Sequence, residues 1–524
     1  MTKLQRILTA IGAGMLLFFT LGAWSLSSPV GSSPDDDFHL ASIWCGQGER
    51  PGLCELGSKE NSRLVPDKAQ TASCYAFQPT ITAACQGSEY LDEGFSLAET
   101  ARVNAGSGQY PAGYYLISSF FASNNIAVAT VTIRLFNSAL FAALLVLTWM
   151  MLPRILRFTL AGSSLLTFLP LGLFIIASVN PSSWAFMSGA LLIPALLGWY
   201  SASGWRRWAL GGISAIAAAL GFAARGDSAA YVIVGALAAM VLAFHRTQEY
   251  WLRSLLPLAM LCIGAVLFIS SGQTGLALEG EMGGDPEAPN PTSKFALLAI
   301  NLVSLPILWN GIFGQGWGLG WLDTVMPPIV PAVTILFFCG VLFSSLHNLN
   351  WRRALALAGV GAAVIVIPTY VLVQSGVVAG QSIQPRYVLP LITMFLAVAI
   401  APNFRGRTAW ASNWEPGYLP SKLQIALIAL GFAGVQSIAL FTNLRRNVTT
   451  GSYNIDGAID WWWNAGPSPF GVFTIGSLSW AALMLVFALA FHRSAAAKPH
   501  IEASGVEPES SAADQATQRS QRSA

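Results

Sequence analysis

The sequence predicts an all-helical polytopic membrane protein with about twelve transmembrane helices. Of its 524 residues, 54% are hydrophobic and only 10% are charged, and the mean hydropathy is +0.55. A soluble domain carries about 25% charged residues, so this composition excludes a soluble multidomain enzyme. It also excludes a disordered or fibrous chain, and the net charge of +3 gives no indication of a nucleic-acid partner.

The N-terminal apolar segment, 7–26, is the first predicted span. It follows Lys3 and Arg6 and has about 20 residues, which is the length that crosses a bilayer. A cleaved signal peptide has a shorter apolar core, so an uncleaved anchor is predicted, although the exit at Ser27-Ser28-Pro29 resembles a cleavage site. Further apolar runs follow at 126–150, 156–178, 183–201, 208–224, 229–244, 254–271, 329–346, 354–374, 386–401, 422–442 and 470–491.

Basic residues between these runs give the chain an orientation. Most of them fall on the side that holds Lys3 and Arg6, and by the positive-inside rule that side is the cytoplasm. Both termini are therefore expected in the cytoplasm. Arg445 and Arg446 depart from the rule, because they fall outside. The arginines that obey the positive-inside rule are Arg154, Arg157, Arg206, Arg207, Arg246, Arg253, Arg352, Arg353, Arg405, Arg407 and Arg493.

One more apolar stretch, Phe295 to Phe313, decides the parity of the later spans. If it crossed the bilayer as an additional span, Arg352 and Arg353 would lie outside. The sequence therefore favours a re-entrant or interfacial helix within the outer segment 272–328, with a true crossing as the alternative. Backbone of this kind is tolerated at membrane depth where it is buried in protein or lines a cavity.

The predicted organisation is a transmembrane domain over 1–491 followed by a cytoplasmic tail over 492–524. The tail is rich in Ala, Ser, Glu and Gln without apolar periodicity, which predicts disorder. The largest soluble piece is the outer loop 29–125, which separates the first two spans.

Four of the six cysteines, Cys45, Cys54, Cys74 and Cys85, lie in this outer loop. An even number of cysteines in one outer loop indicates two disulfides in an oxidising compartment, and three pairings are possible. A zinc site is the alternative, but none of the spacings is that of a CxxC pair. The sequence therefore predicts a disulfide-containing outer loop.

An acidic motif, Pro34-Asp35-Asp36-Asp37-Phe38-His39, lies just beyond the outer end of the first span. Three adjacent carboxylates repel one another, so the pKa of at least one should rise. Such a carboxylate can act as a general base or, with its neighbours, hold a divalent cation. The alternative is a solvated acidic turn that caps a short helix beginning near Phe38. The candidate catalytic residues are Asp35, Asp36, Asp37 and His39.

A second motif, Gln384-Pro385-Arg386-Tyr387, opens the span 386–401 at its outer end. An arginine at this place runs against the charge bias of the chain. It can reach lipid headgroups, or it can clamp a phosphate or pyrophosphate through two parallel hydrogen bonds. Gln384, Arg386 and Tyr387 are therefore candidate substrate-binding residues.

Further polar residues collect at the outer ends of other spans. Charged residues at membrane depth are costly and usually face a cavity or a partner, so their convergence at one face favours a site there. The Gly-rich outer segment 311–323, which ends in Asp323, has no lysine after its glycines and therefore does not match a phosphate-binding loop. These additional candidate substrate-binding residues are Arg134, Asn137, Asn180, Arg225 and Asp323.

Taken together, these motifs resemble a bacterial family of uncharacterised membrane proteins, domain-of-unknown-function family 2142. Pro34-Asp35-Asp36 with His39 resembles the family's Pro-Asp-Glu-x-x-His motif, with Asp36 where Glu is usual. The resemblance covers roughly residues 10–490, and the order of the short motifs supports it. The other matching motifs are Arg134-Leu135-Phe136-Asn137, Gly320-Trp321-Leu322-Asp323 with Pro327, and Gln384 to Tyr387.

That family is similar to the GT-C superfamily of glycosyltransferases, which are polytopic enzymes with an acidic motif in the first outer loop. The resemblance implies a GT-C-like fold in a bacterial plasma membrane and a polyprenyl-phosphate sugar donor. It also implies an envelope glycan or lipid as acceptor. Asp35 and Asp36 would be the catalytic carboxylates and Arg386 would neutralise the leaving phosphate. A divalent metal is permitted but not required.

Two other classes of function fit the sequence. Twelve spans with both termini inside is a common arrangement for a transporter or a lipid or glycan flippase, whose site usually lies at the bilayer midplane. A non-catalytic envelope scaffold is the third reading, and it has no need of the acidic motif. We expect one outer cavity around Asp35, Asp36, Arg386 and Arg134 in an enzyme, and a central two-sided path in a transporter.

Overall fold

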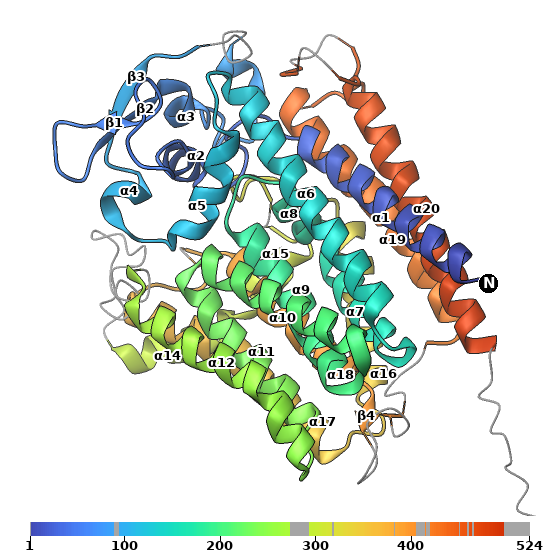
Figure 1. Ribbon diagram of the computed structural model, residues 1–524. Helices are drawn as coiled ribbons and strands as arrows, with labels where there is room; N and C mark the ends of the chain where they lie inside the picture. Colours follow the sequence, from blue (N-terminus) through green and yellow to red (C-terminus); the bar gives the residue numbers. More distant parts are fainter. Residues whose placement is uncertain are drawn as a thin grey trace, which may run out of the picture.

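The computed structural model of the chain is a bundle of long helices with a smaller mixed layer over one end (Figure 1). The described residues are 2–87, 94–272, 293–316, 319–381, 383–404, 414–415, 420–449, 451–457, 461–463 and 466–496. Arg405 and Arg407, which support the predicted orientation, and most of the predicted tail lie outside these residues.

Among the described residues, ten helices are long and apolar enough to cross a membrane, and three shorter apolar helices accompany them. All twelve predicted apolar runs fall on these helices, so the polytopic fold is confirmed. The long ones are α1 (Lys3–Leu26), α6 (Ile126–Met151), α7 (Arg154–Thr167) continuing through η4 (Phe168–Gly172) into α8 (Leu173–Ile176), α9 (Ser182–Ser201), α10 (Gly204–Ala224), α12 (Gln248–Ser270), α14 (Lys294–Ser304) with α15 (Pro306–Ile312), α17 (Trp351–Gln374), α19 (Lys422–Val448) and α20 (Pro469–Ala496). The shorter ones are α11 (Gly226–Leu242), α16 (Ile329–Ser345) and α18 (Pro385–Ile400).

Helices α7, α9 and α18 form the centre of the bundle, where they pack against one another. The most apolar stretch of α9 is entirely buried, whereas only 28% of the corresponding stretch of α20 is. A helix that is apolar on every side is stable only when it is surrounded, so α9 takes the interior. Helices α1, α19 and α20 run side by side along one edge (Figure 1).

The smaller layer contains the segment between α1 and α6. Its three strands pair antiparallel in the order β1-β2-β3, with Glu55 opposite Leu64 and Leu64 opposite Glu99. The elements are α2 (Asp36–Trp44), β1 (Glu55–Leu56), β2 (Arg63–Pro66), α3 (Asp67–Thr71), η1 (Ala83–Gln86), β3 (Leu97–Thr100), α4 (Asn104–Ser107), α5 (Ala112–Ser118) and η3 (Ser119–Phe121). A second antiparallel pair, β4 (Asn403–Phe404) and β5 (Trp414–Glu415), lies at the other end of the bundle (Figure 1).

Two disulfides stabilise this layer, as the sequence predicts. Cys45 is bonded to Cys54 and Cys74 to Cys85, which decides among the three pairings and excludes the zinc alternative. Closing a loop of this size stabilises a fold by roughly 3 kcal/mol in the chain-entropy account. We call this end of the bundle the disulfide end, and the opposite end, where α1 begins and α20 ends, the terminal end.

The segment that decides the parity of the spans has both of its flanks at the disulfide end. Lys294 at the start of α14 donates to Gln374 at the end of α17, 3.1 Å away, and the Trp321 indole donates to the carbonyl of Gly31 at 2.8 Å. The ring of Trp351, at the start of α17, packs 6.1 Å from that of Phe244 at the terminal end. These contacts favour the re-entrant reading of 295–313, which stays a prediction because its length alone would allow a crossing.

Candidate functional site

Asp35 lies in the turn between α1 and α2 and has a backbone conformation that few residues adopt. Its φ of 63° and ψ of 18° are left-handed, a region in which Asp and Asn are enriched among non-glycine residues. It is the residue before α2, yet its carboxylate makes no capping hydrogen bond. Instead, it accepts a hydrogen bond from Nη2 of Arg386 at 2.6 Å. The acidic turn is therefore more than a helix cap.

Asp36 points the opposite way, into the protein, and is completely buried. Its carboxylate accepts hydrogen bonds from the amide nitrogen of Ser33 at 3.0 Å and from the Ser33 hydroxyl. Burial raises its pKa to about 7, because an ionised carboxylate is costly to remove from water. Asp36 is thus the carboxylate of the motif whose pKa is raised, but the cause is burial and not the repulsion among carboxylates that the sequence suggests.

Asp37 takes a third direction, towards the exposed Arg102, with whose Nε it pairs at 2.7 Å. The Arg102 side chain is 60% exposed and also lies 3.9 Å from the Asp35 carboxylate. Because the three carboxylates diverge, they do not form a common ligand set. Among the described residues, no group of three or more His, Cys, Asp or Glu side chains is arranged to hold a metal ion. The three carboxylates of the acidic motif therefore do not form a metal site made of protein side chains alone.

His39 lies one turn along α2 and is buried within a cluster of aromatic rings. Its Nδ1 is 2.9 Å from the hydroxyl of Tyr115 in α5, and the rings of Phe38 and Tyr110 contact it edge-on. Burial lowers its pKa to about 3, so the imidazole is neutral near pH 7. Its Nε2 has no hydrogen-bond partner among the described residues. His39 is therefore a neutral, buried group behind the carboxylates.

Arg386 stands in the first turn of α18, after Pro385, which suits the first helical position because it lacks an N–H. The buried guanidinium donates to the Pro34 carbonyl at 3.0 Å, to Asp35 at 2.6 Å and to the Tyr387 hydroxyl at 3.2 Å. Asp35 and Arg386 are 351 residues apart in the sequence, and the structure brings them into contact, as expected. The cavity expected around them stays a prediction.

Tyr387 connects this pair to a second buried arginine. The Arg225 guanidinium lies 4.0 Å from the centre of the Tyr387 ring, and that of Arg386 lies 5.1 Å from it. Arg225 is bound to Asp227 through two hydrogen bonds of 2.9 and 3.1 Å, while its Nη1 has no partner among the described residues. Two guanidinium groups therefore flank one aromatic ring beside Asp35.

Of three other predicted residues, Asn180 and Arg134 hold the segment that carries the acidic motif, and Asn137 binds the neighbouring helices. Asn180 donates to the Pro34 carbonyl at 3.1 Å. Asn137 donates to the Ser178 carbonyl at 3.1 Å and accepts from the Trp184 indole at 3.0 Å. Arg134 is fully buried, and its donors bind the carbonyl groups of Ser25, Ser28 and Pro29 and the Ser32 hydroxyl. It thus satisfies the C-terminal end of α1, where orphan carbonyls need donors.

Of the remaining candidates, Gln384 is the residue before α18, and its side-chain oxygen has no partner among the described residues. Asp323 lies apart from the Asp35–Arg386 pair. It is ion-paired with Arg446 of α19 at 2.7 Å, and both side chains are buried. The structure therefore does not connect Asp323 directly with the acidic motif.

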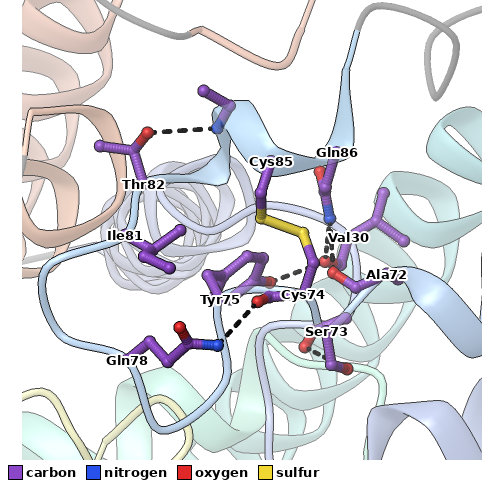
Figure 2. The surroundings of a disulfide bond; sticks show 12 residues. Val30, Ala72, Ser73, Cys74, Tyr75, Gln78, Ile81, Thr82, Cys85 and Gln86 are labelled. Carbon is purple, nitrogen blue, oxygen red and sulfur yellow. Dashed lines mark hydrogen bonds between the residues drawn. A yellow bond between two sulfur atoms is a disulfide. The ribbon is translucent and has the colours of Figure 1, made fainter.

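Arg446 also explains part of the departure from the charge rule. Besides Asp323, it binds the carbonyl groups of Ile81, Tyr75 and Gln78, in the loop that the Cys74–Cys85 disulfide closes. Figure 2 shows this loop: the Tyr75 hydroxyl and the Gln86 amide reach the Val30 carbonyl at 2.7 and 2.8 Å. Val30 lies just before the acidic motif, so the disulfide loop supports the motif from behind.

Sequence reasoning missed two groups of residues at this site. Tyr110 and Tyr115 surround His39, and Arg102 pairs with Asp37. The signal available was a tyrosine-rich stretch, Tyr110 to Tyr115, between Arg102 and Arg134, where no other charged residue occurs. Nothing in the sequence indicates which side chain of that stretch faces the motif.

Comparison with known proteins identifies the family. The family described as "Predicted membrane protein (DUF2142)" matches residues 18–396, which include the acidic motif and Arg386. No curated protein and no solved structure matches the chain. The matched stretch contains more than half of the 524 residues. The chain therefore belongs to the DUF2142 family of predicted membrane proteins.

Proposed function

We propose that the protein is a membrane glycosyltransferase that moves a sugar from a polyprenyl-phosphate donor to a cell-envelope acceptor. The disulfide end of the bundle would face outside the cell, with both termini in the cytoplasm of a bacterium. The observation that carries the proposal is the contact between Asp35 and Arg386, beside a second carboxylate whose pKa is raised to about 7. A carboxylate and a buried arginine from distant segments are the groups that glycosyl transfer from a lipid phosphate needs.

The reaction would be an inverting displacement at the anomeric carbon of the donor sugar. A carboxylate takes the proton of the acceptor hydroxyl while that oxygen forms the new bond to the anomeric carbon. The bond between this carbon and the phosphate oxygen breaks, and polyprenyl phosphate leaves with the electron pair. Arg386 would stabilise the negative charge that develops on the phosphate.

Asp35 is the better candidate for the base, because 34% of its side chain is exposed and Asp36 is fully buried. Burial, the largest single influence, would raise the pKa of Asp35, but the nearby positive charges and the hydrogen bond from Arg386 together lower it, with Arg386 contributing most. A donor phosphate that takes over the Nη2 of Arg386 would release the Asp35 carboxylate. Its pKa would then rise, which makes it a stronger base when the donor is bound.

The other members of the motif would position this base. Asp36 holds the turn through Ser33, and His39 contacts Tyr115 on α5. Arg225 and Tyr387 add a second cation and a phenol hydroxyl next to Arg386. The proposed mechanism assigns every step to these side chains.

A transporter or flippase is the competing proposal. Transport sites usually lie near the bilayer midplane on broken helices. The break at η4, between α7 and α8, is surrounded by the apolar rings of Phe141, Phe168 and Phe186 and carries no charge. The ion pairs of Arg225, Arg386 and Arg446 lie instead at the disulfide end, whereas Arg253 at the terminal end pairs with Glu249, whose side chain is 53% exposed. This distribution favours the enzyme.

The decisive experiment is a transfer assay with purified protein and a polyprenyl-phosphate sugar. Replacing the base in Asp35→Asn should reduce turnover roughly 100- to 10,000-fold. Asp36→Asn should have a smaller effect, and the matched control Asp37→Asn, next in the chain, should retain activity because Asp37 pairs with the exposed Arg102 and not with Arg386. If both Asp35→Asn and Asp36→Asn transfer sugar at the wild-type rate, the enzyme proposal for this site is wrong. Mass spectrometry of envelope glycans from cells with and without the protein would identify the product.

A further inference from the structure

Helix α5 and η3 form an amphipathic segment, 112–121, at the disulfide end. Its buried face carries Tyr114, Tyr115 and Ser118. On the opposite face, 42% of the surface of Leu116, 38% of Ile117 and 67% of Phe120 are exposed. Burying each such side chain against an apolar partner would contribute roughly 1.5–3 kcal/mol, so an apolar partner on this face would be stabilising.

Three contacts place this segment level with the ends of membrane-spanning helices. Gly108, just before α5, packs against Gly272, just after α12. Gly113 packs against Ala223 in the last turn of α10. The ring of Phe121 lies 5.0 Å from that of Phe136, in the part of α6 that binds the end of α1 through Arg134. Figure 1 shows α5 where the smaller layer meets the bundle.

The stretch of chain that contains this face carries no charged residue. Between Arg102 and Arg134 the sequence contains no Asp, Glu, Lys or Arg. Leu56 in β1 provides the contrast, because 56% of its surface is exposed but Glu55 and Lys59 are close to it in the chain. Single apolar residues among charges are normal on a water-facing surface, whereas a charge-free apolar face next to the membrane belt is not.

We propose that Leu116, Ile117 and Phe120 bind the acyl chains of membrane lipids in the leaflet at the disulfide end. Segment 112–121 is then an interfacial helix that lies in the boundary between headgroups and acyl chains. Its exposed face continues the lipid-facing belt of the spanning helices. This inference does not depend on the proposed glycosyltransferase activity.

The opposite face of the same helix contacts the candidate site. The Tyr115 hydroxyl is 2.9 Å from Nδ1 of His39, and the Tyr114 ring lies 5.2 Å from the Trp184 ring. A single helix therefore separates the lipid from the acidic motif. Lipid binding on one face fixes the height of that motif relative to the membrane surface.

The test measures where a probe on this face resides. On a Cys262→Ser, Cys339→Ser background, which removes both free cysteines, single Phe120→Cys and Leu56→Cys variants receive a nitroxide spin label in lipid nanodiscs. Frequent collision of the nitroxide with oxygen indicates that the label lies in lipid, and frequent collision with a water-soluble nickel chelate indicates that it lies in water. We expect the label at 120 to collide mainly with oxygen and the label at 56 mainly with the chelate.

Ile117→Cys is the second probe if the Phe120 variant fails to fold, and mass spectrometry of both native disulfides verifies the fold. A label at 120 that meets the chelate as often as the label at 56 overturns the proposal. So does a label at 120 that is shielded from both colliders, because that result indicates a protein partner on this face.

Discussion

The buried arginines at the two ends of the bundle have different partners. At the terminal end, Arg353 binds the carbonyl groups of Ser345 and Ala401, where α16 and α18 end. Arg253 binds those of Trp199, Tyr200 and Ala202, where α9 ends, and also pairs with Glu249, a half-exposed residue one turn earlier in α12. At the disulfide end, Arg386, Arg225 and Arg446 pair with the carboxylates of Asp35, Asp227 and Asp323. Carbonyl groups at helix ends are part of the fold.

A carboxylate, by contrast, can be exchanged for another anion. The guanidinium group binds carboxylates and phosphates with the same geometry, so a paired arginine can pass from one to the other. The arginines of the terminal end bind mainly the carbonyl groups of helix ends, while the proposed function requires Arg386 at the disulfide end to bind a phosphate as well. Arg134 lies at the disulfide end and still binds carbonyl groups, so the role of an arginine depends on its partner and not on the end at which it lies.

The largest expected effect concerns the side of the membrane on which each end of the bundle lies. A reporter fusion answers this question with an all-or-none result. A reporter fused after Asn350 should read cytoplasmic, and so should one fused after Ala202, which precedes the disputed segment. The reason is that 295–313 returns to the side it entered, so Arg352 and Arg353 stay inside. A cytoplasmic reading at 202 with an external reading at 350 would restore the additional span.

Removing the arginine that pairs with the candidate base should have the next largest effect. Arg386→Ala should lower sugar transfer roughly 100- to 1,000-fold, because a donor aimed at the leaving phosphate is lost. Arg386→Lys should restore only part of it, since lysine lacks the planar fork. The transfer assay measures both variants, and the thermal unfolding midpoint serves as the control for folding. Wild-type transfer by Arg386→Ala would remove the distinction between the two ends.

Removing an arginine at the terminal end should instead affect stability. Arg353→Ala leaves buried carbonyl acceptors without a donor, which costs about 1–3 kcal/mol for each group. Thermal unfolding of the purified protein should show the loss, while transfer per folded molecule stays unchanged. The matched control is Arg352→Ala, whose guanidinium lies over the Trp351 ring and is less buried. Equal losses for both variants would contradict this account.

The stability of the folded protein should depend on pH because the pKa of Asp36 is raised by burial. Its pKa is raised from the usual 3.8 to about 7, so the folded protein binds this proton more tightly than the unfolded chain. The resulting stabilisation is fully present below pH 3.8 and is lost as the pH rises through about 7. The unfolding midpoint of the wild type should therefore fall relative to that of Asp36→Asn between pH 4 and pH 8. Parallel curves would show that Asp36 ionises at its usual pKa.

The smallest effect should come from the exposed arginine of the disulfide end. Arg102 pairs with Asp37, but 60% of its side chain is exposed, and pairs of this kind contribute about 0–1 kcal/mol. Arg102→Ala should unfold near the wild-type midpoint and transfer sugar at a similar rate. A large loss of transfer would extend the functional set from the buried pairs to this exposed one.

Much of the fold could be predicted because it follows from local patterns. The twelve apolar runs became helices because an apolar segment in a membrane must satisfy its own backbone hydrogen bonds. The four clustered cysteines predicted two disulfides, but their pairing stayed open, since three arrangements share one sequence. Asp35 and Arg386 were expected to meet because each is costly alone near the membrane.

Other features depend on contacts between segments far apart in the chain. The left-handed conformation of Asp35, the inward turn of Asp36 and the partner of Asp323 arise where several helices end together. The sequence treats Arg446 as an exception to a charge rule, and the structure makes it a bond between α19 and the Cys74–Cys85 loop.

The sequence by itself determined that the chain spans a membrane, where its helices lie and which end carries the disulfides. Hydrophobicity, charge and cysteine spacing are local properties, so they can be read along the chain. Only the tertiary structure decided which arginines bind carbonyl groups, which bind carboxylates and which, such as Arg446, bind both. The physical reason is that a buried guanidinium takes whichever acceptors the neighbouring helices bring to it, and that choice is made in three dimensions.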